Sequence, residues 1–252
     1  MIEIWHYLLI SLGINILMFI PAYIWKTDVF TDLSYALSFI ILIIGALLLN
    51  SFSAVKLVVA IMVVIWGLRL GIFLFIRIRK IKSDKRFDGI RESFPKFLRF
   101  WVLQGLAVWV ILVSALLFMI SPASEVFWLG AVIWLLGLLT ESIADLQKYR
   151  FSQISHNKGR FIRSGLWKYS RHPNYFGEIT CWVGMYLLVF LSLGQSEKVL
   201  ALASPLFIMI LLIFVTGLPP LEKSADGKWG KDKDYIEYKR KTSVLIPWLP
   251  KN

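Results

Sequence analysis

The stretch RSGLWKYSRHPNYFGEITCW, residues 163–182, is basic and aromatic and runs directly into an apolar segment. Arg171 and His172 stand just before a proline whose fixed φ and missing N–H suit the first turn of a helix. The N-terminus of such a helix attracts anions such as phosphate. Asn174 and Glu178 are four residues apart and share one face of that helix. The stretch therefore offers the partners of a nucleotide: cations for phosphate groups, Glu178 for ribose hydroxyls and Asn174 for an amide or a base edge.

The same residue types also fit an anchor at a membrane interface. In that interpretation Trp167, Tyr169 and Tyr175 join an aromatic belt, and Arg171 binds lipid phosphate. The residue types alone leave both interpretations open.

Two further acidic residues, Glu141 and Asp145, lie one helical turn apart near the end of an apolar segment. Ionisable residues inside a membrane span are costly and mark functional sites by default. Because like charges at this spacing repel, we expect a cationic or hydrogen-bond-donating partner opposite, either Arg69 or a residue of the basic loops. An ion-pair network that only fixes helix packing is the alternative.

The composition indicates the class of protein that must position these groups. The chain has 252 residues, of which 58% are hydrophobic and 17% charged, and its mean hydropathy is +0.68. Soluble domains are much less apolar, so an all-α integral membrane protein is expected. The lone Cys181 excludes an internal disulfide, and three scattered histidines form no recognisable metal site. P-loop and G-x-G-x-x-G motifs are absent from the sequence, so a soluble-type Rossmann site is excluded.

Seven apolar stretches have the length of a membrane span, about 20 residues. They are approximately Ile4–Ile24, Leu33–Asn50, Ala54–Ile76, Phe97–Ile120, Val126–Ala144, Tyr175–Leu193 and Val199–Leu218. We therefore predict a single transmembrane domain over residues 1–252, a bundle of about seven helices, with the cofactor half at about residues 77–252.

The basic residues predict the orientation of this bundle. If the spans alternate in direction, 25 of the 28 Lys and Arg residues lie on one side, Lys56 and Lys198 lie on the other, and Arg69 lies within the third span. Cytoplasmic loops are enriched in Lys and Arg, so the N-terminus is predicted outside and the C-terminus in the cytoplasm. The net charge of +12 is then explained by the membrane, and no nucleic-acid partner is needed.

Five segments, taken in order, resemble the bacterial DUF1295 group, which is allied to the steroid 5α-reductases and the sterol C14 and C24 reductases. They cover about residues 60 to 250 and read WGLRLGIFLFIRIRK, FWVLQG, ESIADLQKYRF, GLWKYSRHPNYFGE and PPLEKSADGKWGKDKDYIEYKRKTSVLIPW. The resemblance implies a membrane reductase that takes NADPH from the cytoplasmic face.

Residues of the cofactor site follow from this resemblance by position. Asp145 matches the acidic residue at the end of the family's fifth span, and Tyr238 matches a C-terminal tyrosine that closes over the cofactor. Together with the opening stretch, the predicted cofactor-binding set is Arg77, Arg79, Asp145, Tyr169, Arg171, His172, Asn174, Tyr175, Glu178 and Tyr238. A proton donor is also needed, and the candidates by position are Glu141, Tyr175 and Glu178. No metal is expected.

The chain departs from the steroid enzymes at the substrate end. Its second span lacks their Gln-Glu pair, and Trp66 stands near the position of their third-span tyrosine. The resemblance therefore does not carry over a 3-keto-steroid substrate.

A rival resemblance shares the core motif. Membrane methyltransferases of the isoprenylcysteine and phospholipid type also carry R-H-P-x-Y-x-G and a later E-E, where this chain has Glu222-Lys223. Their F-G-x-x-Y-x-x-Y and I-P elements are echoed by Trp229, Gly230, Tyr235, Tyr238 and Ile246-Pro247.

We therefore predict an NADPH-dependent reductase of a carbon–carbon double bond in a lipophilic substrate, steroid-, sterol- or fatty-acyl-like, that arrives from the bilayer. The runner-up is an S-adenosylmethionine-dependent membrane methyltransferase, and the third class is a non-catalytic lipid-binding or scaffold protein. The expected location is a bacterial inner membrane, with the cofactor site on the cytoplasmic side.

Overall fold

The computed structural model describes residues 3–81, 87–122 and 125–251. Within these ranges the regular structure is helical, apart from one isolated bridge between Ser170 and Ser243. Seven helical segments among the described residues have the length and apolar composition needed to cross a membrane. The predicted all-α bundle with about seven spans is therefore confirmed, and the orientation of its termini stays a prediction.

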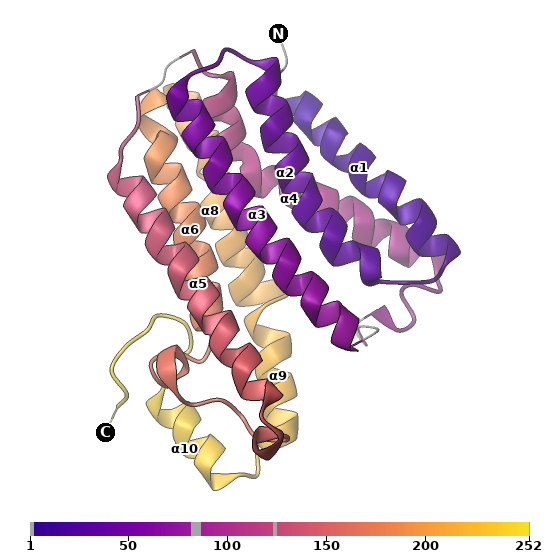
Figure 1. Ribbon diagram of the computed structural model, residues 1–252, viewed down its shortest axis with the longest axis vertical. Helices are drawn as coiled ribbons and strands as arrows, with labels where there is room; N and C mark the ends of the chain where they lie inside the picture. Colours follow the sequence, from indigo (N-terminus) through magenta and orange to yellow (C-terminus); the bar gives the residue numbers. More distant parts are fainter. Residues whose placement is uncertain (1–2, 82–86, 123–124, 252) are drawn as a thin grey trace. The chain divides into compact units, whose positions relative to one another are not determined.

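The chain divides into two compact units, and most of their helices are labelled in Figure 1. The first unit comprises residues 1–126 and 189–204, and the second comprises residues 127–188 and 205–252. The candidate chemistry of the sequence falls mainly in the second unit.

The helices of the first unit are α1 (Ile4–Ile24), α2 (Val29–Leu49), α3 (Ala54–Ile81), α4 (Phe94–Ile120) and the short α7 (Gln195–Ala201). Helix α1 packs mainly against α4, and α2 packs mainly against α3.

The Leu-Gln-Gly element of the sequence joins the helices of the first unit. Gln104 Nε2 donates to Asn15 Oδ1 at 2.9 Å and to Ser34 Oγ at 3.1 Å. One residue further on, Ser11 Oγ donates to the carbonyl oxygen of Gly105 at 2.7 Å. Such polar contacts hold apolar helices together where lipid supplies no hydrophobic driving force. Gln104 and Gly105 thus attach α4 to α1 and α2.

Lys56, one of the two lysines on the predicted outer side, is buried at the end of α4. Its Nζ donates to the carbonyl oxygen of Met119 at 2.8 Å and to Ser51 Oγ at 3.0 Å. The last carbonyls of a helix lack intrahelical partners and carry partial negative charge, so a cation there is stabilising. This lysine therefore closes a helix end.

The helices of the second unit are α5 (Leu129–Gln153), α6 (Pro173–Val189), α9 (Leu218–Trp229) and α10 (Lys233–Lys241), and the boundary between the units falls within α8 (Ala203–Ile210). Helix α6 begins at Pro173, as predicted. Helix α5 continues nine residues beyond the predicted end of its span at Ala144, because Gln, Lys, Tyr and Arg side chains sustain a helix outside the apolar region. The added turns place Lys148 on the same rigid helix as Glu141 and Asp145.

Four glycines bring the backbones of α5 and α6 into contact. Gly130 and Gly137 on α5, and Gly177 and Gly184 on α6, are each seven residues apart. A Cβ atom added at Gly177 would lie 2.5 Å from the backbone nitrogen of Glu141, and one at Gly130 would lie 2.2 Å from that of Leu188. Small residues at this spacing let membrane helices approach closely. This contact fixes Glu141 directly beside the start of α6.

The last predicted span, Val199–Leu218, lies within the seventh membrane-crossing segment, Gln195–Trp229, but this segment is not one continuous α-helix. The chain forms α7, α8, a π-helical turn at Leu211–Val215 and then α9. A Cβ atom at Gly217 would lie 2.2 Å from the carbonyl oxygen of Leu212, so only glycine fits this bend. The two prolines after Leu218 have no N–H to continue the preceding helix, but they are tolerated in the first turn of a new one.

The orientation can be tested with topology reporters. Because the basic residues are divided 25 to 2 between the alternate sides, a reporter fused after Asn252 should report a cytoplasmic position. A reporter inserted next to Lys198 should report an external one. Reversal of either signal contradicts the predicted orientation.

Candidate functional site

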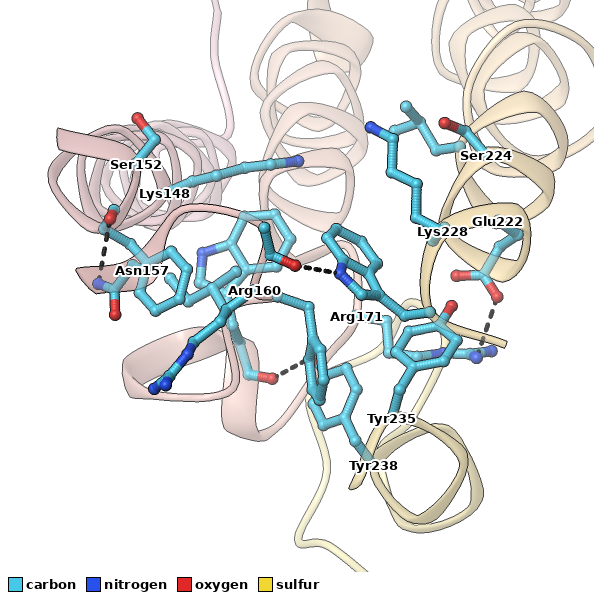
Figure 2. Close-up of a pocket in the computed structure, with 18 of the residues that line it drawn as sticks. Lys148, Ser152, Asn157, Arg160, Arg171, Glu222, Ser224, Lys228, Tyr235 and Tyr238 are labelled. Atoms are coloured by element: carbon cyan, nitrogen blue, oxygen red, sulfur yellow. Dashed lines mark hydrogen bonds and ion pairs between the residues drawn. The ribbon is translucent and has the colours of Figure 1, made fainter. Parts of the chain in front are cut away.

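The second unit contains a pocket of about 440 Å³ beyond the apolar part of its helices. Its walls come from the end of α5, the loop that precedes α6, helix α9 and helix α10 (Figure 2). Its charged and aromatic lining residues are Lys148, Phe151, Lys158, Arg160, Phe161, Trp167, Arg171, His172, Glu222, Lys228, Trp229, Tyr235 and Tyr238.

The pocket lining carries an excess of positive charge. Among the described residues that line it, five are Lys or Arg and one is a carboxylate, Glu222. Figure 2 shows Lys148 and Lys228 extending toward each other from α5 and α9. A concave site lined mostly by one sign of charge concentrates ligands of the opposite sign. The pocket is therefore suited to an anionic ligand.

Glu222 on α9 joins the two residues that precede α6. Its Oε1 lies 2.8 Å from His172 Nε2, and its Oε2 lies 3.0 Å from Arg171 Nη1. The contact between Arg171 and Glu222 is an ion pair whose angles are unsuitable for a hydrogen bond. Arg171 Nη1 and Nε are buried and have no hydrogen-bond partner among the described residues. Arg171 therefore has buried N–H groups to offer a ligand while its charge is partly balanced.

The two ring nitrogens of His172 differ in their contacts with the part of the chain that the structure describes. Burial lowers the pKa of His172, so the ring is neutral at pH 7 and carries one proton. Because Glu222 can only accept, we assign that proton to Nε2, which leaves Nδ1 as an acceptor. Nδ1 is buried and has no hydrogen-bond partner among the described residues. A hydroxyl or an amide N–H of a ligand would satisfy it.

Trp167 forms the inner wall of the pocket. Its side chain is only 3% exposed, its Nε1 donates to the carbonyl oxygen of Ala144 at 3.0 Å, and Lys148 Nζ lies 4.7 Å from its ring centroid. Tyr238 OH donates to the carbonyl oxygen of Trp167 at 2.7 Å. This burial removes Trp167 from the aromatic belt that an interfacial anchor would require.

A second set of polar contacts holds α10 against α9. Lys239 Nζ lies 2.6 Å from Asp226 Oδ1 and 3.3 Å from Glu222 Oε2, and Tyr235 OH donates to Asp226 Oδ1 at 3.1 Å. Burial and the neighbouring carboxylate raise the pKa of Tyr235 to about 12, and burial also raises the pKa of Tyr238. Both phenols therefore stay protonated and keep these hydrogen bonds at physiological pH.

The segment after α10 positions the loop that carries Arg171. The backbone N–H of Arg171 donates to the carbonyl oxygen of Ser243 at 2.8 Å, and Ser170 Oγ donates to that of Leu245 at 2.7 Å. These contacts join parts of the chain that are more than 70 residues apart. They set the backbone from which Arg171 and His172 reach the pocket.

The pocket brings together three of the ten predicted cofactor residues, Arg171, His172 and Tyr238. Tyr169 lines a separate hollow of about 350 Å³ with Pro247, Trp248 and Leu249. Four other predicted cofactor residues lie outside the pocket. Asp145 is buried on α5, and Asn174, Tyr175 and Glu178 are half-buried on the first turns of α6. The candidate proton donor Glu141 is also buried on α5. The side chains of Arg77 and Arg79 lie outside the described residues. The roles assigned to these residues stay predictions.

Sequence reasoning did not single out Lys148, Lys228 and Glu222 as site residues. Lys148 follows Asp145 by three residues, so helical spacing could have placed it on the same face. Glu222 matches only the first glutamate of the methyltransferases' E-E, since Lys223 replaces the second, and no local pattern predicts its position beside Arg171 and His172. Trp229 and Tyr235 were marked by the motif that resembles the methyltransferases, and both line the pocket.

The chain matches the family model described as "Protein of unknown function (DUF1295)" over residues 18–242. It belongs to the DUF1295 family. The DUF1295 match spans both units and includes every residue of the pocket. No curated protein and no solved structure gives a significant match to the chain.

Proposed function

We propose that this DUF1295 protein is a membrane-embedded reductase that uses NADPH to reduce a carbon–carbon double bond in a lipophilic substrate. The observation that carries the proposal is the charge of the pocket, because the described residues that line it include five cations and one carboxylate. NADPH is a polyanion, whereas S-adenosylmethionine carries a sulfonium cation and no phosphate. The charge of the pocket therefore favours the dinucleotide.

The residues present fit the separate parts of this cofactor. Lys148, Lys228 and Arg171 would bind phosphate groups, because N–H donors with positive charge make the strongest bonds to phosphate oxygens. The aromatic rings of the pocket would pack against the adenine. His172 Nδ1, which has no hydrogen-bond partner among the described residues, would accept a hydrogen bond from a ribose hydroxyl.

Bound NADPH would supply a hydride. The protein would orient the cofactor and the substrate, exclude water from the site and donate a proton. Helix α5 carries Lys148 at the pocket and, three and seven residues earlier on the same side, Asp145 and Glu141. Both carboxyl groups are buried, so this face of α5 leads from the pocket into the apolar part of the unit. Glu141 remains a candidate proton donor, together with Tyr175 and Glu178 on α6. The substrate would enter from the bilayer.

One observation favours a second candidate, an S-adenosylmethionine-dependent methyltransferase. The Arg-His pair and Glu222, which belong to separate elements of the rival motif, meet in this structure. Glu222 could pair with the sulfonium or the amino group of that cofactor. The surrounding cations oppose it.

Thermal unfolding of the purified protein in detergent distinguishes these candidates. A ligand that binds only the folded state stabilises it by about 2.7 kcal/mol at 100 times its dissociation constant. We expect NADPH to raise the melting temperature, NADH to raise it less because it lacks the 2′-phosphate, and S-adenosylmethionine to leave it unchanged. Stabilisation by S-adenosylmethionine alone would establish the second candidate instead.

A further inference from the structure

The segment that follows α10 exposes large apolar side chains although its backbone is held in place. Ile246, Trp248 and Leu249 are 61%, 72% and 73% exposed. The segment is tied to the loop before α6, because Ser170 Oγ donates to the carbonyl oxygen of Leu245 at 2.7 Å and the N–H of Trp248 donates to that of Tyr169 at 3.0 Å. A fixed cluster of exposed apolar groups marks an interaction surface.

The position of this cluster within the second unit indicates what covers it. Its anchoring residues, Tyr169 and Ser170, lie three and four positions before Pro173, where the sixth apolar helix begins. In Figure 1 the segment first rises from α10 toward the ends of α5 and α6 and then bends outward to the C-terminus. The cluster therefore lies close to the level at which a membrane-spanning helix leaves the apolar layer.

The chemistry of the cluster matches that level of a bilayer. Trp side chains concentrate at membrane interfaces, where one edge of the ring is apolar and the other is hydrated. Lys168 and Lys251 flank the cluster and are exposed, as cations that bind lipid phosphate must be. Tyr169, Pro247, Trp248 and Leu249 line an open apolar hollow of about 350 Å³, into which part of a lipid molecule could fit.

We propose that residues 244–251 form an interfacial foot: Ile246, Trp248 and Leu249 enter the phospholipid headgroup region, and Lys168 and Lys251 bind lipid phosphates. This surface lies outside the proposed nucleotide pocket, and its contact with lipid does not depend on the reaction proposed there. The foot is hydrogen-bonded to residues 169 and 170, in the loop that forms one wall of the pocket. Contact of the foot with lipid would therefore hold that wall at a constant distance from the membrane surface.

The depth of the foot can be measured with fluorescent labels in lipid nanodiscs that contain phosphatidylglycerol. Cys181, the native cysteine, is replaced by alanine, and Ile246→Cys or Leu249→Cys carries the label. The matched control is Ile236→Cys, an isoleucine on α10 that is 53% exposed and surrounded by charged residues. We expect headgroup-level spin-labelled lipid to quench the two foot labels several times more strongly than the control. Aqueous iodide should show the reverse preference.

Three results would overturn the proposal. Equal iodide quenching of foot and control labels would place the foot in water. Protection of the foot labels from both quenchers would mean that protein, such as a second copy of the chain, covers it. Lipid quenching that stays unchanged in discs of neutral lipid would remove the role assigned to Lys168 and Lys251. None of these measurements requires NADPH, so failure here is distinct from failure of the proposed reductase function.

Discussion

Replacement of Lys148 and Lys228 together by glutamine is expected to weaken NADPH binding by about 100-fold or more. The two side chains extend toward each other across the pocket, where each can donate to a phosphate oxygen (Figure 2). A hydrogen bond to a charged group contributes about 1.5–3 kcal/mol, and every 1.4 kcal/mol changes a dissociation constant about tenfold. Titration of NADPH into the purified double variant, followed by calorimetry or nicotinamide fluorescence, measures the loss.

A matched control separates a local contact from the loss of overall positive charge. Lys231→Gln with Lys233→Gln removes the same charge from two exposed lysines, one between α9 and α10 and one at the start of α10, that do not line the pocket. This control should keep nearly wild-type affinity, and both double variants should unfold at similar temperatures without ligand. Equal affinity in the two double variants would show that the pocket does not hold the phosphates. The wild-type affinity should also fall as salt increases, because salt screens interactions of exposed charges.

Replacement of Gly177 by alanine is expected to destabilise the protein by about 3 kcal/mol, the upper part of the range for overpacking. The added Cβ would lie 2.5 Å from the backbone nitrogen of Glu141 and 2.7 Å from the carbonyl oxygen of Gly137. Backbone atoms cannot rotate away as a flexible side chain can, so α5 and α6 must separate. Their separation removes packing along a contact that also holds Gly130 and Gly184.

The control for this prediction lies in the first unit. Gly13 and Gly45 are in the interiors of α1 and α2, and a Cβ atom added at either would meet nothing within 4 Å. Alanine there should be neutral or stabilising by a few tenths of a kcal/mol to about 1 kcal/mol, because alanine favours the helical conformation. Thermal unfolding in one detergent compares the three variants. If Gly177→Ala unfolds at the same temperature as Gly45→Ala, α5 and α6 do not pack this closely.

The sequence by itself determined the class of the fold and most helix positions. Hydropathy and length predicted seven membrane spans, and Pro173 marked the start of α6, because these features depend on local composition and local backbone geometry. Hydropathy also located the last span, but it did not predict the interruption of the helix inside that span. There a π-helical turn and Gly217 interrupt an apolar run that shows no break in hydropathy.

Only the tertiary structure decided which side chains share a site. Glu222 reaches His172 across 50 residues of sequence, and Tyr238 OH bonds the backbone of Trp167 across 71. The same packing buries Trp167 in the wall of a pocket and leaves Trp248 exposed, although each tryptophan has a lysine within three residues in the sequence. Composition and spacing report what one segment can do. Contacts between distant segments arise from the packing of whole helices against one another, such as α5 on α6 through their glycines, and that packing decides which charges face a common ligand.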